Sequence, residues 1–465
     1  MKRTLCKFFA LVAVITLISV FVISCGEDDI AGSRFVDNDF YLGNGSGYLF
    51  DIRSPYQNVN WDTFGQFKAA QHAHTINSDG SGTMEQVLKV YYDNDYDIVG
   101  ITDHVHAENH GRREPLNDPP GSPHRKYLNL INRRVTNNTW TFGGFTYNLT
   151  HITQQRLNEF QSGTAESSTR TVNRGMLVLA GTGELAPGGD PTPDEVNVFF
   201  WPDNVAAPNA WTVQLREGLL AVHRAGAIGF INHPGRSTHA QNFRVPPANN
   251  PIVDMVDPLN PSNQPAMIRR YANLYMEFPH STIAGMEVFN RRDQDSLHDR
   301  ILWDNVNKLT IPEGRFVWGY GNDDLHSFAV SATGSGAHIN YNVYVMPSNT
   351  PGNLRYAMTN GHSYMVTVVA YNEGVNVPAN STTPRPAITK IDFVPDTDVI
   401  QITATNATRI DWISDGRIIR TTTGNFGSLD LSASNNINNV GTFIRANIIG
   451  PGGMAVTQPI STKRK

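Results

Sequence analysis

Histidine and acidic side chains stand in short clusters along this chain, and their types and spacing favour metal binding. Imidazole nitrogens and carboxylate oxygens bind Zn, Mn or Fe at about 2.0–2.2 Å. His72 and His74 alternate in an extended segment, so both side chains point to one face and can share an ion. A carboxylate that bridges two ions can hold them close enough to act on one reacting group. The clusters contain His72, His74 and Asp79; His104; Glu184; His233; and Asp324 with His326.

Each cluster taken alone has a structural alternative. A His-x-His pair can arise by chance, an Asp-Gly pair usually marks a turn, and a His-Pro pair is common in loops. Asp324 and His326 could form an ordinary surface pair. A metal centre is favoured because every cluster lies at the same point of a repeating pattern, namely at the end of a predicted strand.

That pattern is an alternation of strands and helices, with each cluster at the end of a strand. Thr83 begins one helix, and Gln86 three residues later completes a capping box. Alternating elements predict parallel βα units, whose carboxyl ends form the face where barrel enzymes gather their active-site residues. Strands are expected at 67–71, 97–101, 176–180, 227–231, 286–289 and 316–320, and further helices at 215–223 and 297–306.

The order of the motifs resembles the PHP (polymerase and histidinol phosphatase) superfamily. The matching text is His-x-His-Thr with Ser-Asp-Gly, Ile-Thr-Asp-His, Gly-x-Glu, Asn-His-Pro and Asp-x-His, within about residues 65–375. Segments 285–290 and 318–326 resemble its bacterial phosphoesterase-like members, which include a branch with carbaryl hydrolase. The resemblance implies a distorted seven-stranded β/α barrel with two or three divalent ions (Zn, Mn or Fe, or alternatively Mg) at its mouth.

The resemblance also implies a role for each ligand. His233 would bind a second ion, to which Glu184 would bridge. In the family a histidine stands where this chain has Glu195, so the second site either keeps a carboxylate ligand with an altered metal preference or is weakly filled. The first ion, with a metal-bound hydroxide, would be held by His72, His74, Glu184 and Asp324, and a third would be surrounded by Asp79, His104 and His326.

Other polar residues near these motifs are candidates for substrate binding. His106 follows His104 by two residues and could join the site, although a loop role is open. Glu287 is a carboxylate within an apolar run, which indicates a structural partner or a supporting position behind the ligands. Guanidinium groups that could clamp a phosphate, or serve ordinary surface roles, are those of Arg112, Arg113, Arg125 and Arg236.

This constellation predicts hydrolysis by metal-bound hydroxide, because a bound ion lowers the pKa of water from 15.7 to about 7. The first hypothesis is a phosphoesterase that acts on a phosphorylated small molecule outside the cytoplasm. The alternatives are a carboxyl or carbamate ester hydrolase of the same fold, and a surface glycan-binding protein with a degenerate metal site. Phosphate-directed arginines at the mouth would favour the first hypothesis, and an apolar mouth would favour the second.

Residues 1–24 have the features of a lipoprotein signal peptide. Three basic residues precede an apolar run from Phe8 to Ile23, and Cys25 then follows in a context that resembles a bacterial lipobox. The run is shorter than the about 20 residues of a spanning helix, although an uncleaved anchor is the alternative. We expect lipid at Cys25, outer-membrane anchoring in the bacterial cell envelope and, from the acidic residues at 27–29, surface exposure rather than a periplasmic location.

Composition limits the classes of partner. Charged residues are 17% of the chain, the formal net charge is −5 and no dense basic stretch occurs, so nucleic acid is not expected as the main partner. The chain has two cysteines, Cys6 in the signal segment and Cys25, which leaves neither a disulfide nor a cysteine metal site in the mature protein.

The chain divides into four expected parts. After the signal, a tether and leading segment covers 25–60, and the metallohydrolase domain covers 61–375. An insertion at about 108–174 interrupts the βα rhythm and is expected to form a lid or binding loop. Residues 387–465 contain short alternating segments and a turn at Asp415–Gly416, which predict a small C-terminal β-sandwich. This last part is expected to act as a structural cap, with glycan binding as the alternative.

Overall fold

The structure is a computed structural model, which describes residues 48–104, 139–142, 145–148, 152–185, 194–202, 205, 214–237, 265–291, 296–327 and 336–465. All of these residues belong to one compact unit that extends from Val36 to Lys465. None of the helices in these ranges has the length and apolar character needed to cross a membrane. Several predicted features lie outside the described residues, namely the signal peptide, Cys25, the tether up to residue 47, His106, Arg112, Arg113 and Arg125.

A five-stranded sheet carries several of the predicted ligands. Its strand order is β11-β10-β9-β8-β7. The strands β9, β10 and β11 are parallel, whereas β8 is antiparallel to both of its neighbours. The reversal at β8 departs from the parallel units predicted from the sequence. The bounds are β7 (Gly183–Leu185), β8 (Glu195–Phe199), β9 (Ile228–Asn232), β10 (Ile283–Asn290) and β11 (Trp318–Asn322).

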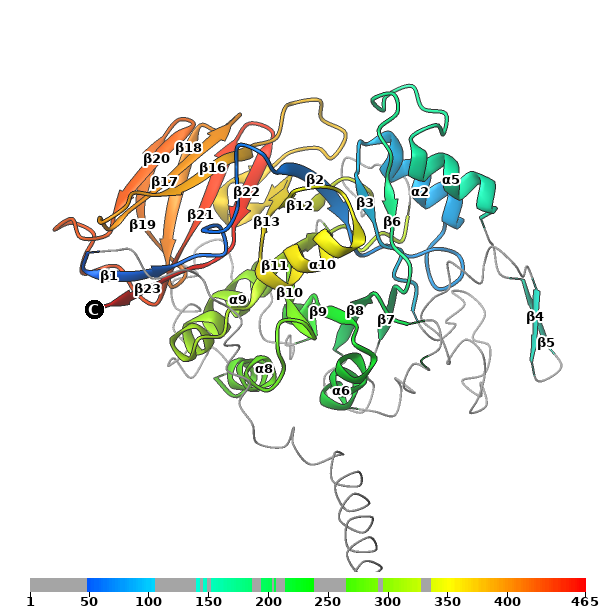
Figure 1. Ribbon diagram of the computed structural model, residues 1–465, viewed down its shortest axis with the longest axis horizontal. Helices are drawn as coiled ribbons and strands as arrows, with labels where there is room; N and C mark the ends of the chain where they lie inside the picture. Colours follow the sequence, from blue (N-terminus) through cyan, green and yellow to red (C-terminus); the bar gives the residue numbers. More distant parts are fainter. Residues whose placement is uncertain are drawn as a thin grey trace, which may run out of the picture. The chain divides into compact units, whose positions relative to one another are not determined.

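A second, larger sheet begins with three parallel strands and continues through antiparallel ones (Figure 1). The parallel strands are β2, β3 and β6, and β2 also pairs with the antiparallel strand β12. The next strand along the sheet is β13, which leads into strands near the C-terminus. The bounds are β2 (Gly65–Ala70), β3 (Ile98–Val99), β6 (Leu177–Val178), β12 (Asn340–Met346) and β13 (Ser363–Thr367).

Two isolated parallel bridges connect these sheets beside the predicted ligands. One joins Ala73, after β2, to Leu325, after β11, and the other joins His104, after β3, to Glu184 in β7. The described residues therefore show a mixed α/β fold in which two sheets meet around the predicted ligands. A closed barrel of seven strands stays a prediction.

Each predicted helix and strand overlaps an observed element, although the strands predicted at 97–101 and 176–180 are only two residues long, in β3 and β6. The capping box is present, because Thr83 Oγ1 accepts from Gln86 N at 3.2 Å and Gln86 Oε1 accepts from Thr83 N at 2.8 Å. The helices α6, α8 and α9 share one core with the five-stranded sheet, and α10 contacts β12. The bounds are α2 (Met84–Asp93), α6 (Leu215–Ala225), α7 (Pro234–Ser237), α8 (Pro265–Glu277), α9 (Ser296–Thr310) and α10 (Pro351–Asn360); short elements are η3 (Ile311–Glu313), β14 (Val369–Ala370), η4 (Tyr371–Glu373) and β15 (Val375–Asn376).

The described end of the insertion is packed, which corrects the expectation of a lid or binding loop for that part. The helix α5 (Gln154–Ser162) places Leu157 and Phe160 in the main core, and the Phe160 ring contacts Tyr92 of α2 at a centroid distance of 5.2 Å. An amphipathic helix buries its apolar face wherever a neighbouring apolar face is available. Earlier in the insertion, β4 (Thr139–Phe142) and β5 (Phe145–Asn148) form an antiparallel hairpin.

The C-terminal strands form two packed sheets, one of which is continuous with the sheet around the ligands. The sheet β16-β17-β20 shares a core with Trp412 and Ile448 of the larger sheet. In the larger sheet, β22 pairs with β13, and β23 pairs with the N-terminal strand β1. Hydrogen bonds therefore cross the predicted boundary near residue 387. The bounds are β1 (Phe50–Arg53), β16 (Ala387–Phe393), β17 (Val399–Thr405), β18 (Arg409–Ser414), β19 (Arg417–Thr423), β20 (Phe426–Asp430), β21 (Phe443–Gly450), β22 (Gly453–Thr457) and β23 (Ile460–Arg464).

Candidate metal centre

The predicted ligands come together where the two sheets meet. Within the described residues, four groups each place three ligand atoms within 4.8 Å of one another. Together the groups contain all nine of the predicted metal ligands. The distances between the ligand atoms could not be predicted from the sequence. The groups are His72–His233–Asp324, His72–His74–Glu184, His74–Asp79–His326 and His104–Glu184–Glu195.

His72, His74, Glu184 and Asp324 are almost fully buried, and the two carboxylates lie beside the paired Nε2 atoms of the two histidines but belong to different groups. The Nε2 atoms of His72 and His74 are 3.1 Å apart. Asp324 Oδ1 lies 3.2 Å and 3.3 Å from these two nitrogens, and the Glu184 oxygens lie 3.4 Å and 3.3 Å from them. Donors at the corners of a tetrahedron, each about 2.0–2.1 Å from an ion, are about 3.3–3.4 Å apart. The donor types and spacing of the His72–His74–Glu184 group therefore fit a divalent ion, and Asp324 lies on the neighbouring side of the same two nitrogens.

A second group lies beside the first and includes the residue that departs from the family pattern. Glu195 pairs with Asn232 across β8 and β9, which brings its Oε2 to 3.1 Å from His233 Nε2. His104 Nδ1 lies 3.3 Å from Glu184 Oε2. That Oε2 is buried and receives no hydrogen bond from the part of the chain that the structure describes. This carboxylate oxygen lies 3.3 Å from His74 Nε2 as well as from His104 Nδ1, and with His104 and Glu195 it fits a second cation site.

The third group surrounds Asp79. Its Oδ2 lies 2.7 Å from His326 Nε2 and 3.5 Å from His104 Nε2, as the resemblance implied. Its Oδ1 also lies 3.2 Å from His74 Nδ1, a contact that the sequence did not indicate. His104 and His74 thus face two groups each, one through each ring nitrogen.

Glu287 supports the ligands from below. It is fully buried in β10. One carboxylate oxygen accepts from His72 Nδ1 at 2.8 Å, and the other accepts from the backbone N–H of His233 at 3.0 Å. Asn290 and Asn322 donate to the same carboxylate at 2.9 Å each. A proton on His72 Nδ1 leaves the Nε2 lone pair facing the ligand group, so Glu287 has the supporting position suggested by its sequence context.

Two further buried carboxylates, which sequence reasoning missed, hold the backbone next to predicted ligands. Asp103 accepts from the backbone N–H of Thr75 at 2.6 Å and from the Ser78 hydroxyl at 2.8 Å. Asp323 accepts from three consecutive backbone N–H groups, those of residues 338–340, at 2.8–2.9 Å. Each of them directly precedes a predicted ligand in the sequence, which was the available signal.

Arg291 was also missed. Its Nε lies 2.8 Å from Asp324 Oδ2, and its Nη2 lies 2.8 Å from His326 Nδ1. It directly follows Asn290, the last residue of β10. The sequence signal was only its place after a strand, because two adjacent arginines occur there without a ligand motif.

The electrostatics of the metal-free site are those of interlocked ion pairs. Burial alone raises the pKa of Glu184, but the neighbouring His104 and His72 hold it well below its usual range. Burial likewise lowers the pKa of His104 and His326, yet the surrounding carboxylates raise these values to about 10 and about 9. The pKa of His74 is lowered, chiefly by burial. Protons on imidazoles thus occupy positions for which divalent ions would compete.

The structure does not describe the side chains of the remaining substrate-binding candidates. Arg236 lies in α7, where only the backbone is described. The described residues do not include His106, Arg112 or Arg113. Their roles stay predictions.

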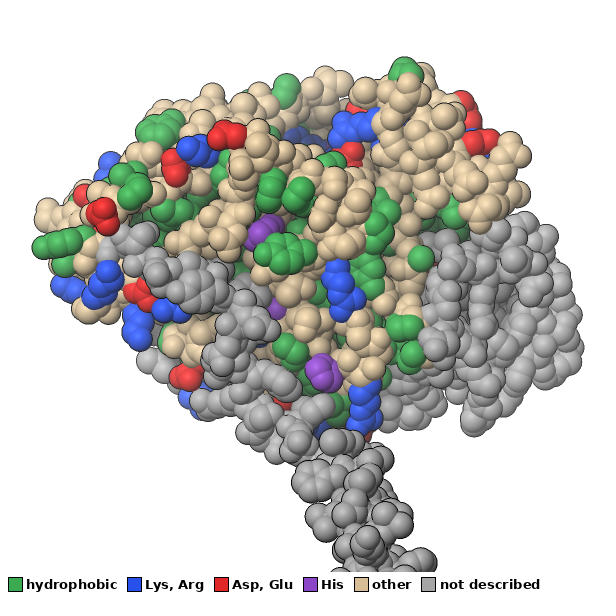
Figure 2. All heavy atoms as spheres, viewed as in Figure 1, with side chains coloured by type: hydrophobic (Ala, Val, Ile, Leu, Met, Phe, Trp, Pro, Cys, Tyr) green, Lys and Arg blue, Asp and Glu red, His purple; other side chains and the backbone are tan. Residues whose placement is uncertain are grey.

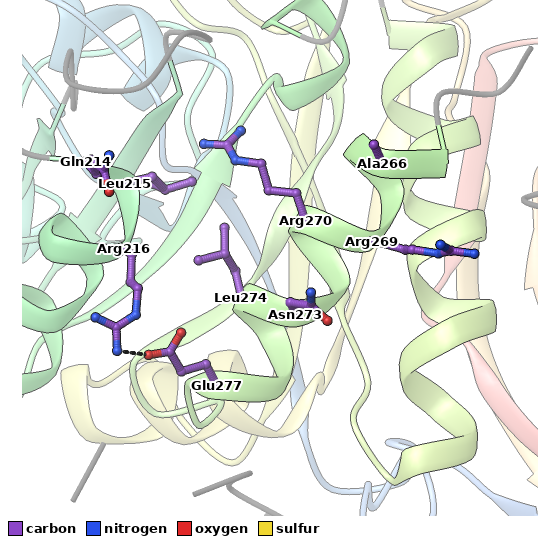
Figure 3. Close-up of a pocket in the computed structure, with 9 residues that line it drawn as sticks. All are labelled: Gln214, Leu215, Arg216, Ala266, Arg269, Arg270, Asn273, Leu274 and Glu277. Atoms are coloured by element: carbon purple, nitrogen blue, oxygen red, sulfur yellow. Dashed lines mark ion pairs between the residues drawn. The ribbon is translucent and has the colours of Figure 1, made fainter. Parts of the chain in front are cut away.

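A cavity of about 450 Å³ lies between α6 and α8 (Figure 3). Leu215 and Leu274 line it, and Arg216 forms an ion pair with Glu277 at one side. None of the residues that line it is a predicted metal ligand. The cavity therefore belongs to the helix layer and is separate from the metal centre.

No family model matches the chain, and no curated protein matches it. Several solved structures are similar to it, including the following three. A two-domain protein from Bacteroides vulgatus that contains a predicted PHP-like metal-dependent phosphoesterase is 12% identical, with a TM-score of 0.39, covering 87% of this chain and 96% of its own. PsfC from Pseudomonas syringae is 13% identical, with a TM-score of 0.31, covering 62% and 84%. The lesion-specific endonuclease PfuEndoQ from Pyrococcus furiosus is 11% identical, with a TM-score of 0.31, covering 63% and 56%. At these levels of similarity, the function of this chain has to be inferred from the ligand cluster itself.

Proposed function

We propose that this protein is a metal-dependent hydrolase that cleaves a phosphate ester. The observation that supports the proposal is the buried pair of His72 and His74 Nε2 atoms, which lie 3.1 Å apart and 3.2–3.4 Å from oxygens of Glu184 and Asp324. These residues would hold the first ion. Divalent ions, when bound, would acidify a water molecule to supply the nucleophile and would neutralise charge that develops on the substrate.

The chain's own residues prepare this site. Glu287 fixes the ring of His72, so that one nitrogen is committed to a hydrogen bond and the other faces the ligand group. Asn232 donates to Glu184 Oε1 at 2.5 Å, which orients the carboxylate that contacts two of the groups. Such fixed partners reduce the reorganisation required during a reaction. The second and third groups, around Glu195 and Asp79, would hold one or two further ions.

The proposed substrate is a small phosphorylated molecule. On the face shown in Figure 2, the Lys and Arg side chains of the described residues are scattered and do not form a continuous basic patch of the kind that binds a nucleic-acid backbone. A carboxyl or carbamate ester is the alternative substrate, and glycan binding without hydrolysis is the alternative function. Both are outcomes of the experiment below.

The test combines metal analysis with a substrate screen. Protein purified without chelators is expected to contain Zn, Mn or Fe and to hydrolyse p-nitrophenyl phosphate or bis(p-nitrophenyl) phosphate faster than p-nitrophenyl acetate. The variants His74→Ala and Asp324→Asn should lose metal and activity together. His223→Ala is the control, because His223 lies in α6 and bonds Thr282 at 2.8 Å, outside the ligand groups.

The proposal is wrong if the protein takes up no divalent ion, or if the ligand variants hydrolyse phosphate esters as fast as the parent. Faster hydrolysis of the acetate or of a carbamate would select the alternative substrate class. Metal binding without any hydrolysis would favour the glycan-binding alternative.

We further propose that the enzyme acts outside the cytoplasm, anchored to the outer membrane through lipid at Cys25 and exposed at the cell surface. The sequence of residues 1–29 supports this location. We also propose that the C-terminal strands stabilise the catalytic part and supply no catalytic group, since no histidine occurs after His362.

A further inference from the structure

Three neighbouring parallel strands end in the same way at the metal centre. The strands β9, β10 and β11 end at Asn232, Asn290 and Asn322. Each is followed within two residues by a non-glycine residue in the left-handed region, with φ of 23° at His233, 49° at Arg291 and 47° at Asp324.

This backbone conformation is unfavourable for residues with a Cβ atom, and it clusters at functional sites where the surroundings enforce it. On the two outer strands, the left-handed residue is a predicted metal ligand. Arg291 occupies the equivalent position on the central strand β10, but its side chain is a permanent cation that cannot bind a metal ion.

The Arg291 side chain lies at the rim of the ligand cluster. Its Nε contacts Asp324 Oδ2 at 2.8 Å, and its Nη2 lies 2.8 Å from His326 Nδ1. The side chain is 29% exposed, whereas that of Asp324 is 2% exposed. The Arg291 backbone is held as well, because its carbonyl accepts from Asn340 Nδ2 at 2.9 Å. The guanidinium is therefore fixed at one edge and open to solvent.

The positive charge of Arg291 lies beside groups that are predicted to bind cations. Arg291 repels any ion that binds to Asp324 or His326, which weakens metal binding by simple electrostatics. The same guanidinium becomes favourable when an anion bridges it to the ions. Its Nη1 has no acceptor among the described residues, so a donor edge remains for such an anion.

We propose that Arg291 is a substrate-binding residue that donates to a non-bridging oxygen of the phosphoryl group. The proposal rests on the function proposed above and deepens it, because it selects tetrahedral anions, namely phosphate monoesters or diesters, over neutral carboxyl and carbamate esters. Charge-assisted hydrogen bonds of this kind are about twice as strong as neutral ones, and the planar guanidinium matches phosphate geometry.

The experiment compares Arg291→Met, which keeps the length but removes the charge, with Arg291→Lys, which keeps the charge but not the fork of donors. The control is Arg53→Met, because Arg53 lies in β1 and pairs with Asp51 at the surface. Three quantities are measured on each metal-loaded protein, namely its metal content, its affinity for inorganic phosphate by calorimetry, and kcat/KM for p-nitrophenyl phosphate and p-nitrophenyl acetate.

Arg291→Met should retain or increase the metal content, because a repulsive charge is gone. It should bind inorganic phosphate about 30-fold more weakly and lose about 100-fold in kcat/KM for the phosphate ester, while the acetate changes by less than about 3-fold. Arg291→Lys should be intermediate, and Arg53→Met should match the parent.

Loss of metal from Arg291→Met, or an equal loss of activity on both esters, would overturn the proposal, because Arg291 would then only position Asp324. Unchanged phosphate affinity would overturn it as well. If the parent protein binds phosphate through Arg291 but hydrolyses no phosphate ester, the proposed reaction fails while this anion site stands.

Discussion

Glu287 and His72 are joined by a buried hydrogen bond of 2.8 Å from His72 Nδ1 to Glu287 Oε1, although they are 215 positions apart in the sequence. The other Glu287 oxygen holds the backbone of His233 at 3.0 Å. One side chain therefore orients two predicted ligands that belong to different strands. This arrangement makes metal affinity depend on a residue that contacts no ion.

Glu287→Gln should lower metal affinity by about 10- to 100-fold, because the amide cannot accept from all of the present donors and the His72 ring loses its fixed orientation. Isothermal titration of the metal-free protein with Zn²⁺ or Mn²⁺ measures the change. Glu277→Gln is the matched control, since Glu277 lies in α8 beside Arg216. Equal affinities in the two variants would show that Glu287 does not support the site.

Changing Glu195 should alter the second ion. Its Oε2 lies 3.1 Å from His233 Nε2, so Glu195→His can supply a nitrogen near the same position and should raise occupancy or affinity. Glu195→Ala should lower both. Metal-to-protein ratios from mass spectrometry, together with activity, give the result. If neither variant changes the ratio or the activity, Glu195 has no part in the site.

A chain that ends at Pro386 should fail to fold into a metal-binding protein. The deletion removes β22, which pairs with β13, and also Gln458, whose side chain accepts from Gly319 N at 2.7 Å and donates to Gly319 O at 2.9 Å on β11. Solubility, circular dichroism and metal content provide the measurement. A soluble, metal-loaded truncated protein would mean that the catalytic part folds alone.

Arg445→Met should destabilise the protein by about 3–5 kcal/mol, because Arg445 and Asp304 form a buried two-pronged ion pair and the substitution leaves the carboxylate without its partner. The two contacts, 2.8 Å each, link β21 to α9. Lys390→Met removes an exposed pair with Asp392 and should change the unfolding free energy by less than about 1 kcal/mol. Urea unfolding compares them, and similar losses would contradict the expectation.

The metal-free protein should lose stability at alkaline pH. The pKa values of His104 and His326 are raised in the folded state to about 10 and about 9, despite burial that lowers them, because carboxylates surround both rings. Their stabilisation is complete below the unfolded pKa, about 6.5, and is lost as pH rises through 9 to 10. Melting temperatures of chelator-treated protein between pH 6 and 10 test this. Metal-loaded protein should show a smaller fall, because ligating imidazoles are already neutral.

Cys25→Ala should abolish lipid attachment. The lipobox-like context predicts that mature protein begins at Cys25 and partitions with membranes, whereas the variant is released or stays unprocessed. Detergent partitioning and mass spectrometry of the N-terminal peptide make the measurement. Mature protein that begins at another residue and carries no lipid would refute the lipoprotein prediction.

The sequence by itself determined the local elements and the ligand types. The capping box of Thr83 and Gln86, the turn at Asp415–Gly416 and the alternating apolar runs act through neighbours a few residues apart, so a periodic pattern is enough to predict them. Histidines and carboxylates at the ends of predicted strands indicated metal chemistry, because parallel strands bring their carboxyl ends to one edge of a sheet.

Only the tertiary structure decided which side chains meet. Because β8 runs antiparallel to β9, Glu195 lies opposite Asn232 and therefore beside His233. The strand β22 pairs with β13 across the boundary expected near residue 387. Arg291 reaches Asp324 because β10 and β11 are adjacent and their ends turn through left-handed residues. These contacts depend on strand order and on packing between segments far apart in the chain, and no local periodicity encodes them.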